Sequence, residues 1–308
     1  MPERYPVRSG IFEIGDSGEW AEWRRELRMK GEHKHKDRFS DKHPVLGLLV
    51  FTFGGFLVSE FLIGIVVMFA LLQLGVDKTT GTAIGGCIGS AVVLLLWYRW
   101  SSPEYRFMPE KGDIRGSFAL ISPILIYWVL LFGLFGYFAG GIPFRAVGLE
   151  TVALALMAGM VEEVCFREIA VSFMAKKLMD EKRIPLMAVA SGFLFGLTHL
   201  SNLVNGDPVT DILYQVMLTI FFGVFFAAVY LRKGNVWVLC LMHFAHDFLS
   251  FMAIKGVDES GVKELPDWTA VCIAVFEGCL CVYGFYLLRK SRRGEIAALW
   301  DHKWSREQ

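Results

Sequence analysis

The chain has 308 residues, 54% of them apolar, with a mean hydropathy of +0.45. Soluble domains are rarely so hydrophobic, so the composition indicates an integral membrane protein with the lipid bilayer as its partner. The formal net charge is zero, and no nucleic acid is expected as a partner. The six cysteines lie in apolar stretches without a C-x-x-C pair, which excludes a disulfide framework.

The ends of the chain are polar and carry amphipathic patterns. Trp20, Trp23 and Leu27 recur at helical spacing among basic residues, which predicts a basic helix lying on an anionic membrane face. A similar pattern closes the chain at 296–304, and a helix packed on the loops is the alternative for both. The expected organisation is a cytoplasmic tail at 1–43, a membrane domain at 44–290 and a cytoplasmic tail at 291–308.

Between the tails, the sequence predicts an all-α membrane protein of eight transmembrane helices, since roughly 20 apolar residues span a bilayer as helix. The first segment is long and contains Glu60, so a tilt or kink is expected there. Lys and Arg are alternately frequent and rare in successive connections, which predicts that both termini are cytoplasmic. The eight segments are expected near 46–75, 80–98, 116–140, 146–178, 186–204, 209–231, 235–254 and 268–288.

The fourth segment carries a cluster of ionisable residues, Glu162, Glu163, Arg167 and Glu168, which need a reason because a charge at mid-bilayer costs at least about 2.5 kcal/mol. Glu163 and Arg167 stand four apart and share a helix face, so an ion pair is expected. Glu162 points about 100° away, which leaves it free to face a cavity as a general base. The alternative is that these charges only tie helices together.

Two histidines lie on other segments. His199 ends the fifth segment and His243 lies in the seventh, and neutral imidazole exchanges protons near physiological pH. Asp247, four residues after His243, shares its face, and either fixes its tautomer or joins it beside a reacting oxygen. A carboxylate and two imidazoles suffice for hydrolysis of a peptide bond by water. The sequence has no His-Glu-x-x-His, Gly-x-Ser-x-Gly or Gly-x-Gly-Asp motif, so other intramembrane protease types are disfavoured.

The clusters form three motifs in a fixed order. They are Glu-Glu-x-x-x-Arg at Glu162, Glu163 and Arg167, Phe-x-x-x-His at Phe195 and His199, and His-x-x-x-Asp at His243 and Asp247. With the run 230–237, they make residues 145–255 resemble the intramembrane glutamic protease family, known as CPBP. That family groups CAAX prenyl endopeptidases with bacteriocin-processing and bacteriocin-immunity proteins.

The resemblance implies an eight-helix intramembrane protease. No cofactor is expected, because no close pair of metal ligands lies on one helix. The resemblance also implies a role for each matched residue: Glu162 and His199 activate water, His243 and Asp247 stabilise the oxyanion, and Glu163 and Arg167 support them. Many members have Asn where this chain has Asp247, and an ionised Asp offers no proton. Asp247 is therefore either protonated or orients His243. The short loops resemble those of prokaryotic members, which favours a bacterial plasma membrane.

Three alternatives remain open from the sequence. Glu162, His199 and His243 are a plausible zinc ligand set, which would make the same protease metal-dependent. A bacteriocin-immunity scaffold would bind a peptide without cutting it. A proton-coupled transporter would use the same carboxylates and histidines as a relay, with Glu60 and Glu277 as further members. The sequence does not show whether the substrate is a prenylated tail, a peptide or a membrane protein.

Overall fold

The computed structural model describes residues 39–102, 104–107, 111–138, 148–206, 208–259 and 267–304. The chain divides into two units, Met1–His43 and Pro44–Gln308. In the first unit only α2 (Phe39–Lys42) is described, so the predicted basic helix around Trp20 lies outside the described residues. The second unit contains every residue of the predicted site.

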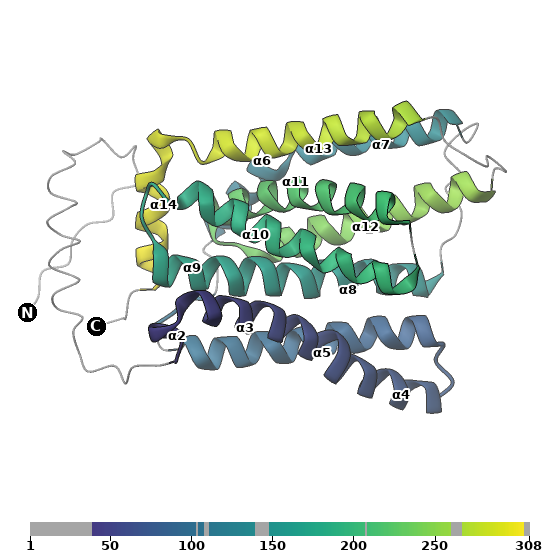
Figure 1. The fold of residues 1–308 in the computed structure, drawn as a ribbon, viewed down its shortest axis with the longest axis horizontal. Helices are drawn as coiled ribbons and strands as arrows, with labels where there is room; N and C mark the ends of the chain where they lie inside the picture. Colours follow the sequence, from purple (N-terminus) through teal and green to yellow (C-terminus); the bar gives the residue numbers. More distant parts are fainter. Residues whose placement is uncertain are drawn as a thin grey trace, which may run out of the picture. The chain divides into compact units, whose positions relative to one another are not determined.

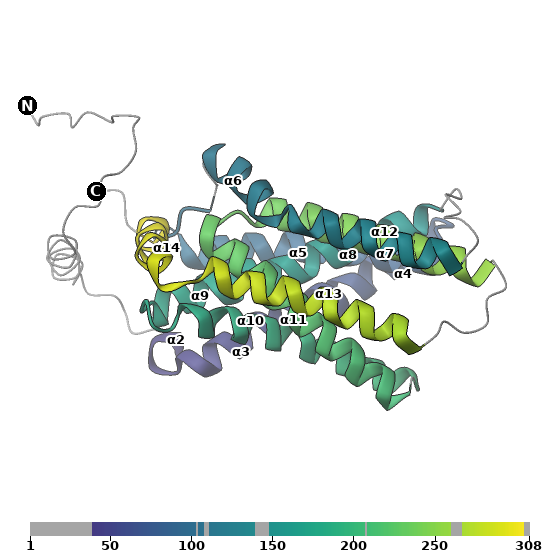
Figure 2. The same cartoon turned by 90° about the horizontal axis from the view of Figure 1, so that it is seen from above.

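All regular structure in the described part of the chain is helical, as the sequence predicts. Figures 1 and 2 show the long helices of the second unit running alongside one another, with α14 lying across the ends of several of them. The elements of this unit are α3 (Pro44–Leu57), η1 (Val58–Gly64), α4 (Ile65–Gln73), α5 (Lys78–Ser101), α6 (Lys111–Ile121), α7 (Pro123–Phe138), α8 (Leu149–Glu163), η2 (Val164–Ile169), α9 (Ala170–Leu178), α10 (Ile184–Thr198), η3 (His199–Asn205), α11 (Val209–Lys233), α12 (Val236–Glu259), α13 (Asp267–Leu287) and α14 (Lys290–Lys303).

Six helices in the described residues are long and apolar enough to cross a membrane. They correspond to six of the eight predicted segments, and the count of eight is not confirmed. The fourth segment, built from α8, η2 and α9, does not meet the same length and hydropathy test, and the apolar part of the seventh, Val236–Met252, is short. These two segments carry five of the six predicted site residues, all except His199, and these polar side chains lower their hydropathy.

The first span is interrupted where the sequence predicted irregularity. The π-helical segment η1, which contains Glu60, separates α3 from α4 and packs closely on α5. The contact depends on glycine, because a β-carbon at Gly89 would overlap the carbonyl oxygen of Ser59. Gly85 lies equally close to the backbone of Gly64. Small residues thus let two backbones meet within the bundle.

Replacing Gly89 with alanine is expected to destabilise this crossing by about 1–3 kcal/mol, because backbone cannot yield to the added methyl as a side chain would. Gly278→Ala on α13 is the matched control, since a β-carbon there would meet nothing within 4 Å. Thermal unfolding in detergent measures both. Equal unfolding temperatures for the two variants would contradict the tight crossing.

The core of the unit surrounds α11. This helix packs against α10 on one side and α13 on another, and its residues from Phe222 to Leu231 are all buried. Gly192 of α10 and Gly223 of α11 face each other, and a β-carbon at Gly223 would lie 2.7 Å from the Cα of Gly192. Close packing here holds α10, which leads into His199, against the centre of the bundle.

The C-terminal pattern at 296–304 forms most of α14, and this helix packs on the bundle. Ile296, Ala297 and Trp300 are buried, and the helix contacts α11 and α9. The indole N–H of Trp300 donates to the carbonyl oxygen of Leu231 at 2.9 Å. The structure thus shows this pattern as a helix packed on α9 and α11.

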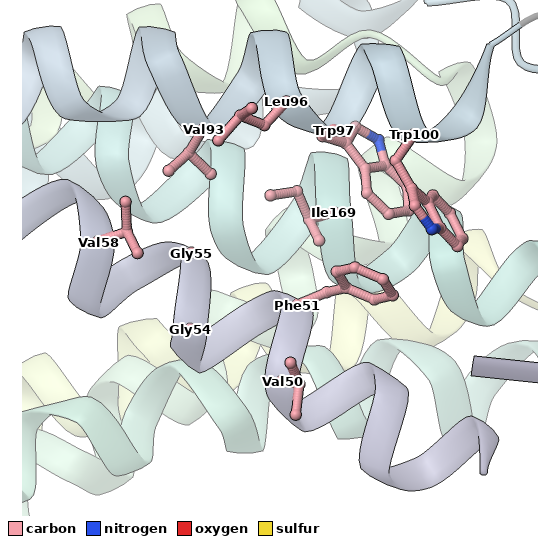
Figure 3. A pocket seen from close by; sticks show the side chains of 10 residues that line it. All are labelled: Val50, Phe51, Gly54, Gly55, Val58, Val93, Leu96, Trp97, Trp100 and Ile169. Carbon is pink, nitrogen blue, oxygen red and sulfur yellow. The ribbon is translucent and has the colours of Figure 1, made fainter. Parts of the chain in front are cut away.

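An apolar cavity of about 230 Å³ lies between α3 and α5, with Ile169 of η2 also in its wall (Figure 3). It exists because α3 presents glycine here: a β-carbon at Gly54 would meet no atom within 4 Å. The cavity is lined by Val50, Phe51, Gly54, Gly55, Val58, Val93, Leu96, Trp97, Trp100 and Ile169. No ionisable residue is among these, so this cavity is not the predicted reaction site.

Candidate active site

The predicted acidic pair and His243 are brought together by the contact between α8 and α12. Gly159 of α8 makes this contact possible, since a β-carbon there would lie 2.7 Å from the carbonyl oxygen of Cys240 and 2.8 Å from the backbone nitrogen of Phe244. Glu162 and Glu163 follow one turn later on α8, level with His243 on α12. Gly159 was not among the predicted site residues, although a glycine one turn before a polar cluster is a usable signal for close helix approach.

His243 is the centre of the cluster and uses both ring nitrogens. Its Nδ1 lies 2.7 Å from Oε1 of Glu163, and its Nε2 lies 3.4 Å from Oε2 of Glu162. Oδ2 of Asp247 lies 3.7 Å from the same Nε2. Because a carboxylate only accepts, Nδ1 carries a hydrogen that it donates to Glu163. The residue that orients the ring is therefore Glu163, while Asp247 lies beside Nε2.

The ion pair expected from the four-residue spacing is present and buried. Nη1 of Arg167 lies 2.9 Å from Oε1 of Glu163, and neither side chain is exposed. The guanidinium also lies over the ring of Phe195, 4.6 Å from its centroid, and 5.7 Å from the ring of Phe226. An Arg cation between aromatic faces and one carboxylate keeps its charge without water. Glu163 and Arg167 thus form a fully buried ion pair next to Nδ1 of His243.

Glu162 and Asp247 differ from this support in their access to the surroundings. The Glu162 side chain is 17% exposed and that of Asp247 is 20% exposed, whereas that of Glu163 is fully buried. The partly exposed carboxylates of Glu162 and Asp247 approach His243 at Nε2, and the buried carboxylate of Glu163 approaches it at Nδ1. A reacting group can therefore reach only the Nε2 side of the imidazole.

His199 lies near this cluster without a hydrogen bond to it. It begins the 3₁₀ turn η3 at the end of α10, and its Nε2 is buried with no hydrogen-bond partner. Its ring meets Phe195 edge-on at 5.4 Å, and Phe195 in turn meets His243 at 5.9 Å. The structure therefore gathers Glu162, His243 and Asp247 directly, and it places His199 one aromatic ring away.

The run 230–237 positions α12. Gly234 ends α11 in the left-handed conformation, with φ of 61°, which favours glycine. Asn235 then begins the next helix: its side-chain oxygen accepts from the backbone N–H of Trp237 at 3.0 Å and of Val238 at 3.3 Å. This turn sets the start of α12, and hence the height at which His243 enters the bundle.

His246, to which the sequence assigned no role, ties α12 to α7. The indole N–H of Trp128 donates to its Nδ1 at 3.0 Å, and its ring packs against Tyr127 at 5.8 Å. The ring of Phe222 lies 4.8 Å from His246 and 5.4 Å from His243. The contact between α7 and α12 thus lies next to the cluster of Glu162, His243 and Asp247.

Trp128→Phe is expected to cost about 1 kcal/mol of stability, because it removes one hydrogen bond and leaves the imidazole nitrogen without a donor. The aromatic packing is retained in this variant. Trp237→Phe serves as the control, since that side chain is 37% exposed and a change within about 0.5 kcal/mol is expected. The two variants are compared by denaturation in detergent, with backbone circular dichroism as the signal because it does not depend on the replaced tryptophans. Indistinguishable midpoints would contradict the stabilising role of the hydrogen bond from Trp128 to His246.

Comparison with protein families matches residues 143–249 to a family described as type II CAAX prenyl endopeptidase Rce1-like. Comparisons with curated proteins and with solved structures found no significant match. The matched segment contains all seven residues of the three motifs, and it spans α8 to most of α12. The resemblance drawn from the motifs is confirmed: over residues 143–249 the chain is similar to the Rce1-like type II CAAX prenyl endopeptidases, which supports a CAAX-type intramembrane protease in general.

Proposed function

We propose that this protein is an intramembrane endopeptidase of the glutamic type, which hydrolyses a peptide bond of a membrane-associated or prenylated substrate with water activated by Glu162. The observation that carries the proposal is the arrangement around His243. Two reachable carboxylates, those of Glu162 and Asp247, lie 3.4 and 3.7 Å from its Nε2, and buried Glu163 holds its Nδ1. The negative charges of Glu162 and Asp247 and the hydrogen-bond donor Nε2 therefore lie on the same side of the His243 ring.

In the proposed reaction Glu162, assisted by His199, removes a proton from water, and the resulting hydroxide attacks the carbonyl carbon of the scissile bond. The oxyanion that forms is stabilised by the Nε2–H of protonated His243. Glu163 balances the imidazolium from behind, since its carboxylate accepts from Nδ1. Collapse of the intermediate breaks the C–N bond, and Glu162 returns its proton to the leaving amine.

Asp247 has a supporting part in this reaction. As a carboxylate it offers no hydrogen to an oxyanion, but its negative charge 3.7 Å from Nε2 favours the imidazolium that does. The role proposed is therefore orientation and charge stabilisation of His243. This is how the Asp of the third motif substitutes for the Asn found in many members of the family.

The proposed setting is the lipid bilayer of a bacterial plasma membrane, with both termini on the cytoplasmic side. The basic connections favour this orientation, since Lys and Arg are retained on that side. The substrate is a peptide or membrane protein, and the proposal is tested first on the class that the family match names.

The experiment uses the full-length protein in liposomes and a farnesylated peptide ending in Cys-Ala-Ala-X. Mass spectrometry is expected to show release of the tripeptide Ala-Ala-X, leaving the prenylated cysteine as the new C-terminus. The same peptide without its prenyl group is the matched control and tests whether the lipid is recognised. If neither peptide is cut, nor any of a panel of membrane-bound peptides, the peptidase proposal is wrong.

Metal dependence is tested in the same assay. In the described part of the chain no group of three or more His, Cys, Asp or Glu side chains is arranged to hold a metal ion. Because the proposed activation of water by Glu162 requires no metal ion, we expect cleavage to continue, within about twofold, after dialysis against a strong chelator, and added zinc to have no effect. Loss of cleavage with chelator and its return with zinc would establish the zinc-dependent alternative.

A further inference from the structure

Three phenylalanine rings surround the imidazole of His243, and two of them belong to none of the three motifs. The ring centroid of Phe195 on α10 lies 5.9 Å from that of His243. On α11, the ring centroids of Phe222 and Phe226 lie 5.4 Å and 5.8 Å from it. All three contacts are edge-to-face, with interplanar angles of 81°, 63° and 71°, an arrangement that aromatic rings favour. Two helices thus supply rings to an imidazole on a third helix.

Phe222 and Phe226 form one surface of α11, which we call the aromatic pair. They stand four residues apart and therefore share a helix face. Their rings are stacked, with centroids 4.1 Å apart and planes at 28°. The two residues are 4% and 0% exposed. Phe225 packs its ring against Tyr283 instead, 6.0 Å away. The aromatic pair therefore faces α12, while Phe225 faces α13.

The aromatic pair is itself held from both ends. Phe222 contacts His246, whose ring centroid lies 4.8 Å away. The Nδ1 of His246 accepts from the indole N–H of Trp128 at 3.0 Å. At the other end, the guanidinium of Arg167 lies 5.7 Å from the ring centroid of Phe226. Contacts from α7, α12 and η2 therefore fix the place of the pair in the bundle.

The polar contacts of His243 leave the tilt of its ring open. Oε1 of Glu163 holds Nδ1 at 2.7 Å, which fixes one edge of the imidazole. At Nε2 the carboxylate oxygens of Glu162 and Asp247 lie 3.4 Å and 3.7 Å away, too far to hold the ring with a strong hydrogen bond. The proposed reaction requires the Nε2–H to point at the oxyanion, since a donor acts well only along a short and nearly straight bond. Packing against the neighbouring rings has to supply the missing constraint.

We propose that Phe222 and Phe226 are positioning residues for the reaction: the aromatic pair fixes the plane of the His243 ring, so that its Nε2–H points to where the oxyanion forms. The inference rests on the proposed function. The rings also exclude water from the imidazole, which strengthens the attraction between the imidazolium and the carboxylate of Glu163. Neither phenylalanine takes or gives a proton itself.

The experiment replaces each phenylalanine of the pair with leucine in the full-length protein in liposomes. Leucine keeps the position apolar but lacks the flat ring that limits the tilt of His243. Phe222→Leu and Phe226→Leu are each expected to lower kcat for the farnesylated peptide roughly tenfold, because a small misplacement of a catalytic group is costly. KM is expected to stay within about twofold, since the lost constraint acts in the transition state. Rates are compared at a temperature at which each variant is folded, as judged by its unfolding curve.

Phe225→Leu is the matched control, because Phe225 lies on the same helix, is 0% exposed and packs on Tyr283. It is expected to lower the unfolding temperature about as much as Phe226→Leu, but to keep kcat within about twofold of the unsubstituted protein. If either variant of the pair keeps kcat as the control does, that residue is merely structural and the inference is wrong. An equal fall of kcat in all three variants would also overturn it, since a general loosening of α11 would then explain the effect. Should a leucine variant fail to fold, methionine at the same position keeps more of the volume and carries the same expectation.

Chemical modification gives a second reading that does not depend on peptidase activity. Diethyl pyrocarbonate reacts with accessible imidazoles, and His243 is 3% exposed. Tandem mass spectrometry of peptides follows the reaction at His243, with the exposed His302 as internal reference. Phe222→Leu and Phe226→Leu are expected to react at His243 severalfold faster than Phe225→Leu and the unsubstituted protein, and equal rates contradict the inference. Should the unsubstituted protein cut no peptide while the two variants react faster, the proposed function fails and the aromatic positioning of His243 stands.

Discussion

Glu162→Gln is expected to lower kcat for peptide cleavage by about a thousandfold, because the amide has the size of the carboxyl but cannot take a proton from water. KM is expected to change little, since the lost interaction acts in the transition state. The variant should fold normally: Glu162 approaches His243 at 3.4 Å, and the arginine pairs with Glu163 instead. Purified variant in liposomes, assayed against the farnesylated peptide, gives both constants.

Two companion variants make this result specific. Glu150→Gln, in the first turn of the same helix, is expected to retain full activity. Glu162→Asp shortens the carboxylate by one methylene and should lose most cleavage, because a general base must lie within hydrogen-bond reach of the water. A proton relay would tolerate that change in part, and a peptide-binding scaffold would tolerate Glu162→Ala. Retained cleavage in Glu162→Gln would remove Glu162 from the mechanism.

Arg167→Met is expected to destabilise the protein by about 3–5 kcal/mol, the cost of leaving a buried carboxylate without its cation. Glu163 would keep only the bond to Nδ1 of His243, and the methionine would still fill the space between Phe195 and Phe226. Thermal unfolding in detergent measures the change. Adding Glu163→Gln to this variant should restore part of the loss, since the uncompensated charge is then removed as well.

A surface ion pair provides the control for this prediction. Nη1 of Arg292 lies 2.7 Å from Oε1 of Glu295, but the two side chains are 41% and 55% exposed. Arg292→Met is therefore expected to cost less than about 1 kcal/mol. The distances of the two pairs are nearly equal, so the difference in stability isolates the effect of burial. Similar losses in both variants would contradict the claim that Arg167 compensates a charge in a dry environment.

The helical class and most of the spans could be predicted because they depend on local patterns. A span needs a run of apolar residues of known length, and six of the predicted runs are helices that meet this requirement. Hydropathy is a weaker guide for the two segments that carry all the predicted site residues except His199. There the polar residues lower the average, and only their partners in the bundle make burial tolerable. The apolar runs predicted these two segments as spans as well, and the structure does not confirm them by the same length and hydropathy test.

The contacts of the site also fall into those that could be predicted from the sequence and those that could not. The pair Glu163 and Arg167 could be predicted from a spacing of four on one helix. The bond from Nδ1 of His243 to Glu163 could not, because it joins residues 80 positions apart and depends on Gly159 letting α8 approach α12. The sequence alone left the orientation of His243 to Asp247, which lies on the same helix; the structure shows that a residue of another helix holds the ring.

The sequence by itself determined that this chain is a helical membrane protein and which residues are too polar for lipid, since both follow from composition and spacing along one chain. The family resemblance came from the three motifs in their order. Only the tertiary structure decided which nitrogen of His243 meets which carboxylate, that His199 and His243 both contact the ring of Phe195, and that Lys303 of the final helix donates to the carbonyl oxygen of Gly234. These are contacts between distant segments, set by how closely helices pack, and packing depends on the shapes of both surfaces at once.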